Sequence, residues 1–110
     1  MARVSVKRPL SFDSEQRLLE KLFLAFSSLG NWQEAEAFFL EFFTRQELTM
    51  LAKRLELYKR IEGKGKYEEV IRALNVTAQT VSSARRKMAR ADVFFTRVLR
   101  KFISLDRRLK

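Results

Sequence analysis

The sequence predicts an all-α protein of about six helices, and three observations support this prediction. Hydrophobic residues make up 46% of the 110 residues, which is enough apolar material to bury the core of one domain. Three glycines and one proline are too few turn residues for a sheet of many short strands. Apolar residues recur at three- and four-residue spacing through most of the chain, as one buried face of a helix requires.

The chain is predicted to begin with a basic arm and to continue as one helical domain. Residues 1–12 carry three basic residues, no acidic residue and no helical periodicity, so we expect a flexible arm there. Residues 13–110 are predicted to form a single domain. Its first helix should run from Asp13 or Ser14 to Gly30.

Two further helices begin at residues that commonly cap helix N-termini. Asn31, followed by Glu34, is predicted to cap a second helix at 32–43. The phenylalanines of that helix leave little polar face, so we expect it to be buried on several sides. Thr44 and Glu47 have capping-box spacing and should open a third helix, which ends at the first or second glycine of a Gly-Lys-Gly-Lys link.

Residues 67–90 have the pattern of a helix-turn-helix. A short helix at 67–74 is followed by a three-residue break at 75–77 and by a helix from 78 to about 90. Asn75 stands where the turn needs a residue that tolerates a left-handed backbone. Six apolar residues fall where two such helices must face each other: Val70, Ile71, Leu74, Val76, Val81 and Ala84.

A last helix at 92–109 is predicted to be amphipathic and basic. Its apolar side is expected to consist of Phe95, Val98, Leu99, Phe102, Ile103 and Leu109. The net charge of the chain is +10, divided as +3 over residues 1–12, −1 over 13–84 and +8 over 85–110. Basic ends around a near-neutral middle favour a polyanionic partner, because each phosphate neutralised by Lys or Arg releases condensed counterions.

The composition argues against an enzyme and against a membrane protein. The chain has no cysteine and no histidine, so it lacks thiolate chemistry, the commonest metal ligand and the commonest general base at neutral pH. No stretch is apolar for long enough to span a membrane or to serve as a signal sequence. We therefore expect a cytoplasmic protein with no metal, no cofactor and no membrane partner.

The second helix of the motif is predicted to read DNA. If Thr77 caps it, short neutral residues project from its outer face and first turn, the part that enters the major groove. The candidate base-reading residues are Ala78, Gln79, Thr80, Ser82 and Ser83. Gln79 can pair with an adenine edge, whereas the basic residues one turn later are candidates for phosphate contacts, which set register rather than sequence. These phosphate candidates are Arg85, Arg86 and Lys87. The alternative interpretation of the neutral residues is a solvated polar face.

Three segments resemble the tryptophan-repressor superfamily. They are Phe-Thr-Arg-Gln-Glu-Leu at 43–48, Leu-Ala-Lys-Arg-Leu-Glu at 51–56 and Leu-Asn-Val-Thr-Ala-Gln-Thr-Val-Ser at 74–82. The resemblance covers about residues 14–105 and is closest to the repressor-like branch. It implies a sequence-specific, double-stranded DNA-binding transcriptional repressor. It also implies an intertwined homodimer, with the helices of residues 13–62 forming the dimer interface.

The resemblance also indicates a candidate effector pocket. In tryptophan-binding members the amino acid is held by a threonine and two arginines, and Thr44, Arg54 and Thr80 match positions of that pocket. The second arginine falls at Ser83 and a neighbouring glycine at Ala84, so a ligand carboxylate would lose a partner and an indole some room. We expect that L-tryptophan is not a corepressor of this chain, and no other effector is indicated.

Other interpretations remain open. Thr44 could be a cap only, and Arg54 could pair with Glu47, Glu56 or a carboxylate of a partner chain. RNA is a possible ligand, because the basic ends would hold either polymer and an aromatic residue such as Tyr67 or Trp32 could stack on a base. A protein-binding adaptor is the third class, with the basic last helix binding an acidic partner.

Overall fold

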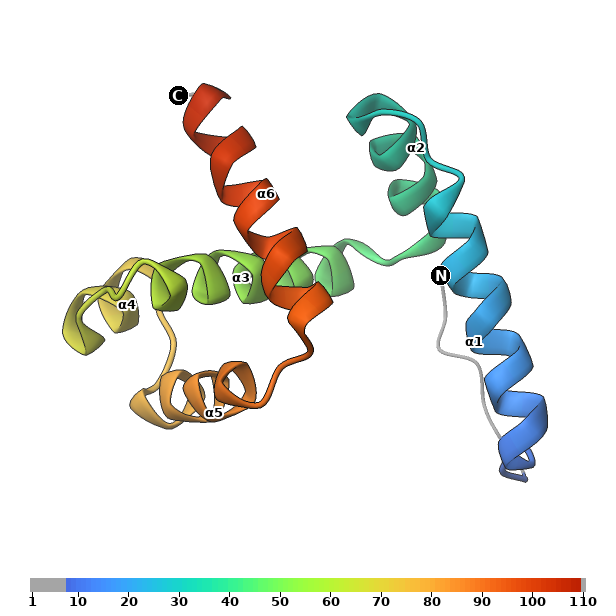
Figure 1. Ribbon diagram of the computed structural model, residues 1–110, viewed down its shortest axis with the longest axis horizontal. Coiled ribbons are helices and arrows are strands. Elements are labelled where there is room, and N and C mark those ends of the chain that lie inside the picture. Colours follow the sequence, from blue (N-terminus) through green and yellow to red (C-terminus); the bar gives the residue numbers. More distant parts are fainter. Residues whose placement is uncertain (1–7, 110) are drawn as a thin grey trace. The chain divides into compact units, whose positions relative to one another are not determined.

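The computed structural model describes residues 8–109, which form six α-helices and no strand (Figure 1). The helices are α1 (Phe12–Ser27), α2 (Trp32–Phe42), α3 (Arg45–Glu62), α4 (Tyr67–Leu74), α5 (Ala78–Ala89) and α6 (Val93–Leu109). The predicted all-α fold class is confirmed. No helix in this described range is long and apolar enough to cross a membrane.

The helices belong to two compact units, one ending at Thr49 and the other beginning at Met50. The first contains α1, α2 and the first turn of α3, and the second contains the rest of α3 with α4, α5 and α6. Most of the predicted basic arm, residues 1–7, lies outside the described residues. The single domain over residues 13–110 stays a prediction.

The first unit begins with a capped helix. The Ser11 hydroxyl accepts a hydrogen bond from the Ser14 backbone N–H at 3.2 Å, so α1 starts at Phe12, slightly earlier than predicted. The side-chain Oδ1 of Asn31 likewise accepts from the Glu34 N–H at 2.9 Å, which confirms the predicted cap of α2. Serines and asparagine cap well because a short side-chain oxygen reaches an N–H that has no partner within the helix.

The predicted capping box at the start of α3 is also present. The Thr44 backbone N–H donates to Glu47 Oε1 at 2.8 Å, and the Glu47 N–H donates to Thr44 Oγ1 at 3.1 Å. The two residues therefore satisfy each other's exposed donors, and α2 and α3 remain separate helices because Phe43 between them has an extended backbone.

Aromatic rings hold α1 to α2. The Phe26 ring centroid lies 5.3 Å from that of Phe39 and 5.9 Å from that of Phe38, both in edge-to-face geometry. Neither helix has a buried residue, and Trp32 and Leu40 on α2 are 68% and 56% exposed. The predicted burial of α2 on several sides is thus not reached within one chain.

The second unit has a small apolar core. Its buried side chains come from α3, α4, α5 and α6: Leu57, Tyr58, Val70, Val81, Ala84 and Leu99. Ile71, Leu74 and Val76 are partly buried against this core. All six apolar residues predicted to form the helix-turn-helix junction therefore pack there. Because Val70 and Val81 are 1% and 0% exposed, they fix how α4 crosses α5.

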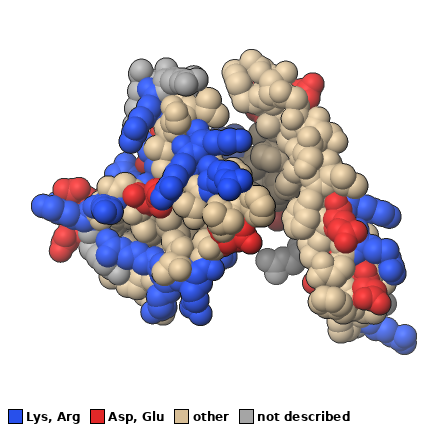
Figure 2. Space-filling view, viewed as in Figure 1, with Lys and Arg blue, Asp and Glu red and all other residues tan. Residues whose placement is uncertain are grey.

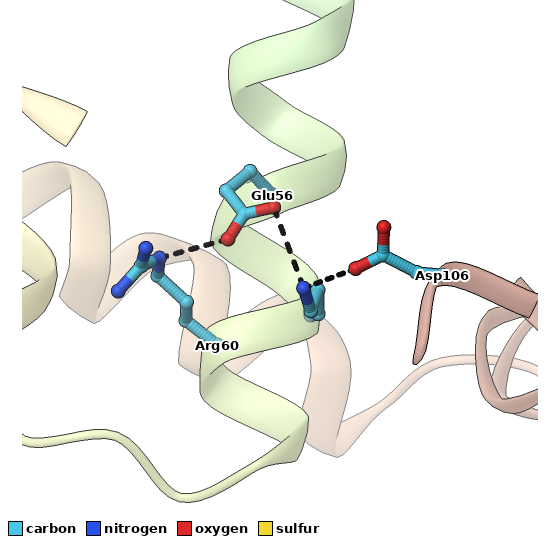
Figure 3. A network of polar contacts seen from close by, with 4 residues as sticks. Glu56, Arg60 and Asp106 are labelled. Carbon is cyan, nitrogen blue, oxygen red and sulfur yellow. Dashed lines mark hydrogen bonds and ion pairs between the residues drawn. The ribbon is translucent and has the colours of Figure 1, made fainter. Parts of the chain in front are cut away.

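Helix α6 is attached to the core by four of its predicted apolar residues, one of which is Phe95, whose ring centroid lies 5.3 Å from that of buried Tyr58. Leu99 is buried, and Phe102 and Ile103 are partly buried. The prediction is wrong for Val98, which is 63% exposed although the periodicity placed it on the apolar side of the helix. A polar network adds to the attachment, since Asp106 of α6 pairs with Lys59 of α3, whose ammonium also lies 3.9 Å from Glu56 (Figure 3).

Candidate nucleic-acid interface

The turn between α4 and α5 has the geometry that the sequence predicted. Asn75 adopts a left-handed conformation with φ 53°, and the Val76 N–H donates to the carbonyl of Ile71 at 3.2 Å. Thr77 Oγ1 then accepts from the Thr80 N–H at 3.1 Å and caps α5. Asparagine tolerates this backbone better than most residues, so α4 ends and α5 begins within three residues.

Helix α5 presents one outer stripe opposite its buried side. Val81 and Ala84 bury one side of the helix. Gln79, Ser83 and Arg86 recur at four- and three-residue spacing, which places them in one row on the opposite side, and all three are exposed. The first two are neutral and near the N-terminus, whereas the arginine lies one turn later. The predicted division between base-reading and phosphate-binding residues would use this row, and it stays a prediction.

Two of the predicted site residues lie on one flank of α5. Thr80 and Lys87 line adjoining hollows together with Arg54 and Leu57 of α3. The Thr80 hydroxyl lies 2.9 Å from that of Thr77, so part of its hydrogen-bonding capacity is used within the cap. Thr80 is exposed and lines the hollow beside Arg54 of α3.

Arg85 lies on the other flank. Its guanidinium Nη2 donates to the carbonyl of Gly65, in the link between α3 and α4, at 3.2 Å. Arg85 was grouped with Arg86 as a phosphate candidate by charge, but the structure separates them: Arg86 is in the outer row, where its Nη2 donates to Ser83 Oγ at 3.2 Å.

The remaining predicted reading residues differ in exposure. Ala78 is exposed in the first turn, whereas Ser82 is half-buried. On geometry, the outer row of Gln79, Ser83 and Arg86 is the strongest part of the predicted surface. The roles of all these residues in DNA recognition stay predictions.

Positive charge surrounds this helix. Helix α5 contains three basic residues and no acidic one, and Arg90 follows at its C-cap. On the face drawn in Figure 2, Lys and Arg side chains gather over the unit that contains α4, α5 and α6. Such a field attracts polyanions. Basic residues in the last turn also stabilise α5 itself, because they face the negative end of the helix dipole.

The candidate effector pocket is present in part. Arg54 and Thr80 line one hollow together, with apolar walls from Met50, Leu57 and Val76. Ser83 and Ala84 line the adjoining one, where Ala84 is buried and Lys87 supplies a cation. Thr44 acts as the cap of α3, as one of the two interpretations proposed. Glu56, one of the carboxylates proposed as a partner of Arg54, pairs with Arg60 and Lys59. Glu47, the other, accepts a hydrogen bond from the Thr44 N–H.

Sequence reasoning missed two features of this unit. The first is the Arg85–Gly65 bond, which joins residues 20 apart in the chain. The second is the use of the only two acidic residues in the basic segment 85–110: Asp92 caps α6 by accepting from the Phe94 N–H at 2.8 Å, and Asp106 pairs with Lys59. Isolated acids in a basic segment are a usable signal for such structural roles.

Comparison with known proteins gives one match. A family described as Trp repressor protein matches residues 17–103, which is most of the chain and includes the whole helix-turn-helix. The resemblance predicted from the sequence is thereby confirmed. Neither the curated proteins nor the solved structures compared with the chain give a match.

Proposed function

Because the chain belongs to the Trp repressor family, whose members are helix-turn-helix DNA-binding regulators and not enzymes, we propose that it represses transcription by binding selected sequences of double-stranded DNA as a homodimer. The prediction that the chain is not an enzyme is confirmed by this membership. Our proposal has three parts: the chain selects particular DNA sequences, it represses transcription, and it acts as a homodimer.

The outer row of α5 is the observation that carries the proposal. A helix that reads the major groove needs short polar residues near its N-terminus and cations where it meets the backbone. Gln79 and Ser83 meet the first requirement and Arg86 the second, and all three are exposed in a single row. RNA binders that stack bases need exposed aromatic residues instead, and α5 contains none.

The homodimer is supported by apolar surface that one chain leaves uncovered. Phe23 and Leu24 on α1, and Trp32 and Leu40 on α2, are each more than half exposed. Contiguous exposed apolar side chains of this size generally mark a protein interface. A second copy of the chain would bury them, and two copies related by twofold symmetry would present two α5 helices to DNA.

We also propose that this regulator binds DNA without L-tryptophan. The hollow between α3 and α5 has Arg54 on one side, but Ser83 stands where the resemblance places the second arginine. A serine hydroxyl cannot provide the paired, charge-assisted contact that an arginine makes with a carboxylate. We also propose that the protein is located in the cytoplasm, since it must reach the DNA it regulates.

Selection from a random duplex pool at physiological salt tests the proposal. We expect enrichment of one sequence in two related half-sites, spaced by one helical turn or a multiple of it. A parallel selection from single-stranded RNA serves as the control. Enrichment in the RNA pool alone would support an RNA-binding protein, and retention of neither polymer would support an adaptor that binds protein.

A further inference from the structure

The link between α3 and α4 has an unusual backbone. The N–H of Gly65 donates to the carbonyl of Arg60 at 2.9 Å, and the N–H of Lys64 donates to that of Ile61 at 2.9 Å. These two bonds define a Schellman motif at the end of α3. In this motif one residue takes a left-handed conformation, and glycine is the usual choice.

Here the left-handed residue is Lys64, with φ 59°, although a glycine stands on each side of it. Neither Gly63 nor Gly65 has a positive φ. A side chain with Cβ is disfavoured in this conformation, so Lys64 destabilises the turn relative to glycine. Its side chain is exposed, so burial in the core does not compensate for this cost. Residues in such conformations are often retained for function.

Gly65, by contrast, is explained by packing. A Cβ at this position would lie 3.1 Å from the carbonyl oxygen of Arg60 and 3.3 Å from a methyl of Val70, which is buried. The carbonyl of the same glycine accepts the hydrogen bond from Arg85 of α5. The link is therefore held on both sides, by α4 through Val70 and by α5 through Arg85.

This arrangement concentrates positive charge beside α5. Lys64 and Lys66 flank the residue that Arg85 contacts, and both are exposed. Within residues 8–109, the ion pairs of this unit join other cations to Glu56, Glu62 and Asp106, and none joins these two lysines to a carboxylate. Glu68 and Glu69 in the first turn of α4 reduce the local field, and no ion pair of the described residues joins them to either lysine.

We propose that Lys64 and Lys66 bind backbone phosphates of the duplex that α5 reads, and that Arg85 is a positioning residue that holds the link against α5. This inference rests on the proposed function. A helix in the major groove is bordered by sugar-phosphate backbone, so a cationic link on the flank of α5 meets phosphates while the outer row meets bases. Three neighbouring cations repel one another in the free protein, and a polyanion relieves that repulsion.

Two substitutions of Lys64 separate its charge from its backbone strain. Lys64→Gly removes both, so we expect the melting temperature to rise by about 4 °C while affinity for duplex DNA falls. Lys64→Ala removes the charge but keeps a Cβ in the left-handed conformation, so the affinity should fall equally without the gain in stability. Loss of one phosphate contact should lower the affinity at 0.15 M salt roughly fivefold and make the salt slope shallower by about 0.9.

Each of the two substitutions should lower the affinity for selected and for random duplexes by the same factor, because phosphate contacts carry no sequence information. Lys21→Ala, at an exposed position on α1, is the matched control and should change the affinity less than twofold. Melting is compared at one protein concentration, since association shifts it.

A double-mutant cycle tests the role of Arg85. If Arg85 acts through the link, Arg85→Ala and the double substitution Lys64→Ala/Lys66→Ala should be less than additive in their effects on affinity. Additive losses would show that Arg85 contacts DNA directly and would overturn its positioning role. If Lys64→Gly keeps full affinity for a duplex that the unmodified chain binds, the phosphate contact of Lys64 is overturned, but the proposed function is not. If the unmodified chain binds no duplex, the proposed function fails as well.

Discussion

Lys59 of α3 and Asp106 of α6 pair across 47 residues of sequence, and both side chains are half-buried, at 19% and 24% exposed. The same lysine lies near Glu56, which in turn accepts a hydrogen bond from Arg60 Nε at 2.9 Å (Figure 3). Partial burial lowers the screening of this pair by water, so it contributes more than a fully exposed pair would. The Lys59–Asp106 pair holds the C-terminal end of α6 against α3, beyond the part of the helix that Leu99 and Phe102 attach to the core.

The first prediction follows from this pair. Asp106→Asn keeps the shape of the side chain but removes its charge, and we expect the free energy of unfolding to fall by about 1 kcal/mol. Urea unfolding at one protein concentration measures the change. Glu62→Gln is the matched control, because its partner Arg100 is 70% exposed and that pair should contribute less than about 0.5 kcal/mol. Equal effects of the two substitutions would contradict the role given to burial.

The second prediction separates the two ends of the outer row of α5. Gln79→Ala should cost about 1 to 3 kcal/mol of binding free energy on the selected site and little on random DNA, because a base contact acts on one sequence only. Arg86→Ala should weaken binding to both DNAs by a similar factor and make the salt slope shallower by about one unit.

Fluorescence anisotropy with both duplexes over a salt series measures these changes. Circular dichroism and sedimentation serve as controls that the variants keep their fold and their oligomeric state. Equal losses on both DNAs for Gln79→Ala would mean that α5 does not read sequence through this residue.

The third prediction uses the only tryptophan of the chain. Trp32 is 68% exposed in one chain, so burial in a homodimer should shift its fluorescence to shorter wavelength, and dilution should reverse the shift. Sedimentation at micromolar protein should show two chains, and Leu40→Lys should yield single chains by placing a charge in the interface. One monomeric species whose unfolding is independent of concentration would contradict the dimer.

The fourth prediction concerns the hollow between α3 and α5. Free L-tryptophan should not increase the affinity for DNA appreciably, since Ser83 lacks the charge that a ligand carboxylate would pair with. Titration calorimetry with and without DNA measures this. A micromolar affinity for tryptophan that Arg54→Ala abolishes would show that Arg54 alone is sufficient to hold the ligand.

The features that could be predicted from sequence are local ones. The caps at Asn31, Thr44 and Thr77 involve residues three apart, so side-chain chemistry and spacing alone specify them. The left-handed turn at Asn75 was predictable because it depends on one residue type that tolerates this backbone conformation. The order of the helices followed from periodicity and caps as well, whereas the intertwined homodimer and the effector pocket were expected from the family resemblance alone.

The features that could not be predicted depend on which side of a helix meets a neighbour. Arg85 and Arg86 are adjacent and carry the same charge, yet only Arg85 faces the carbonyl of Gly65. Val98 has the periodicity of a core residue but no core beside it, because α6 contacts the unit through Leu99 and its neighbours. Apolar periodicity identifies the buried side of a helix only to within about one residue in each turn.

The capping residues have a consequence for how quickly the protein assembles. The side-chain hydrogen bonds of Ser11, Asn31, Thr44, Thr77 and Asp92 each join residues two or three apart. Helix ends that depend on such near neighbours form early, and chains rich in local contacts fold within microseconds to milliseconds. For the proposed homodimer, the meeting of two already helical chains then becomes the slow step, and the rate of refolding should increase with protein concentration.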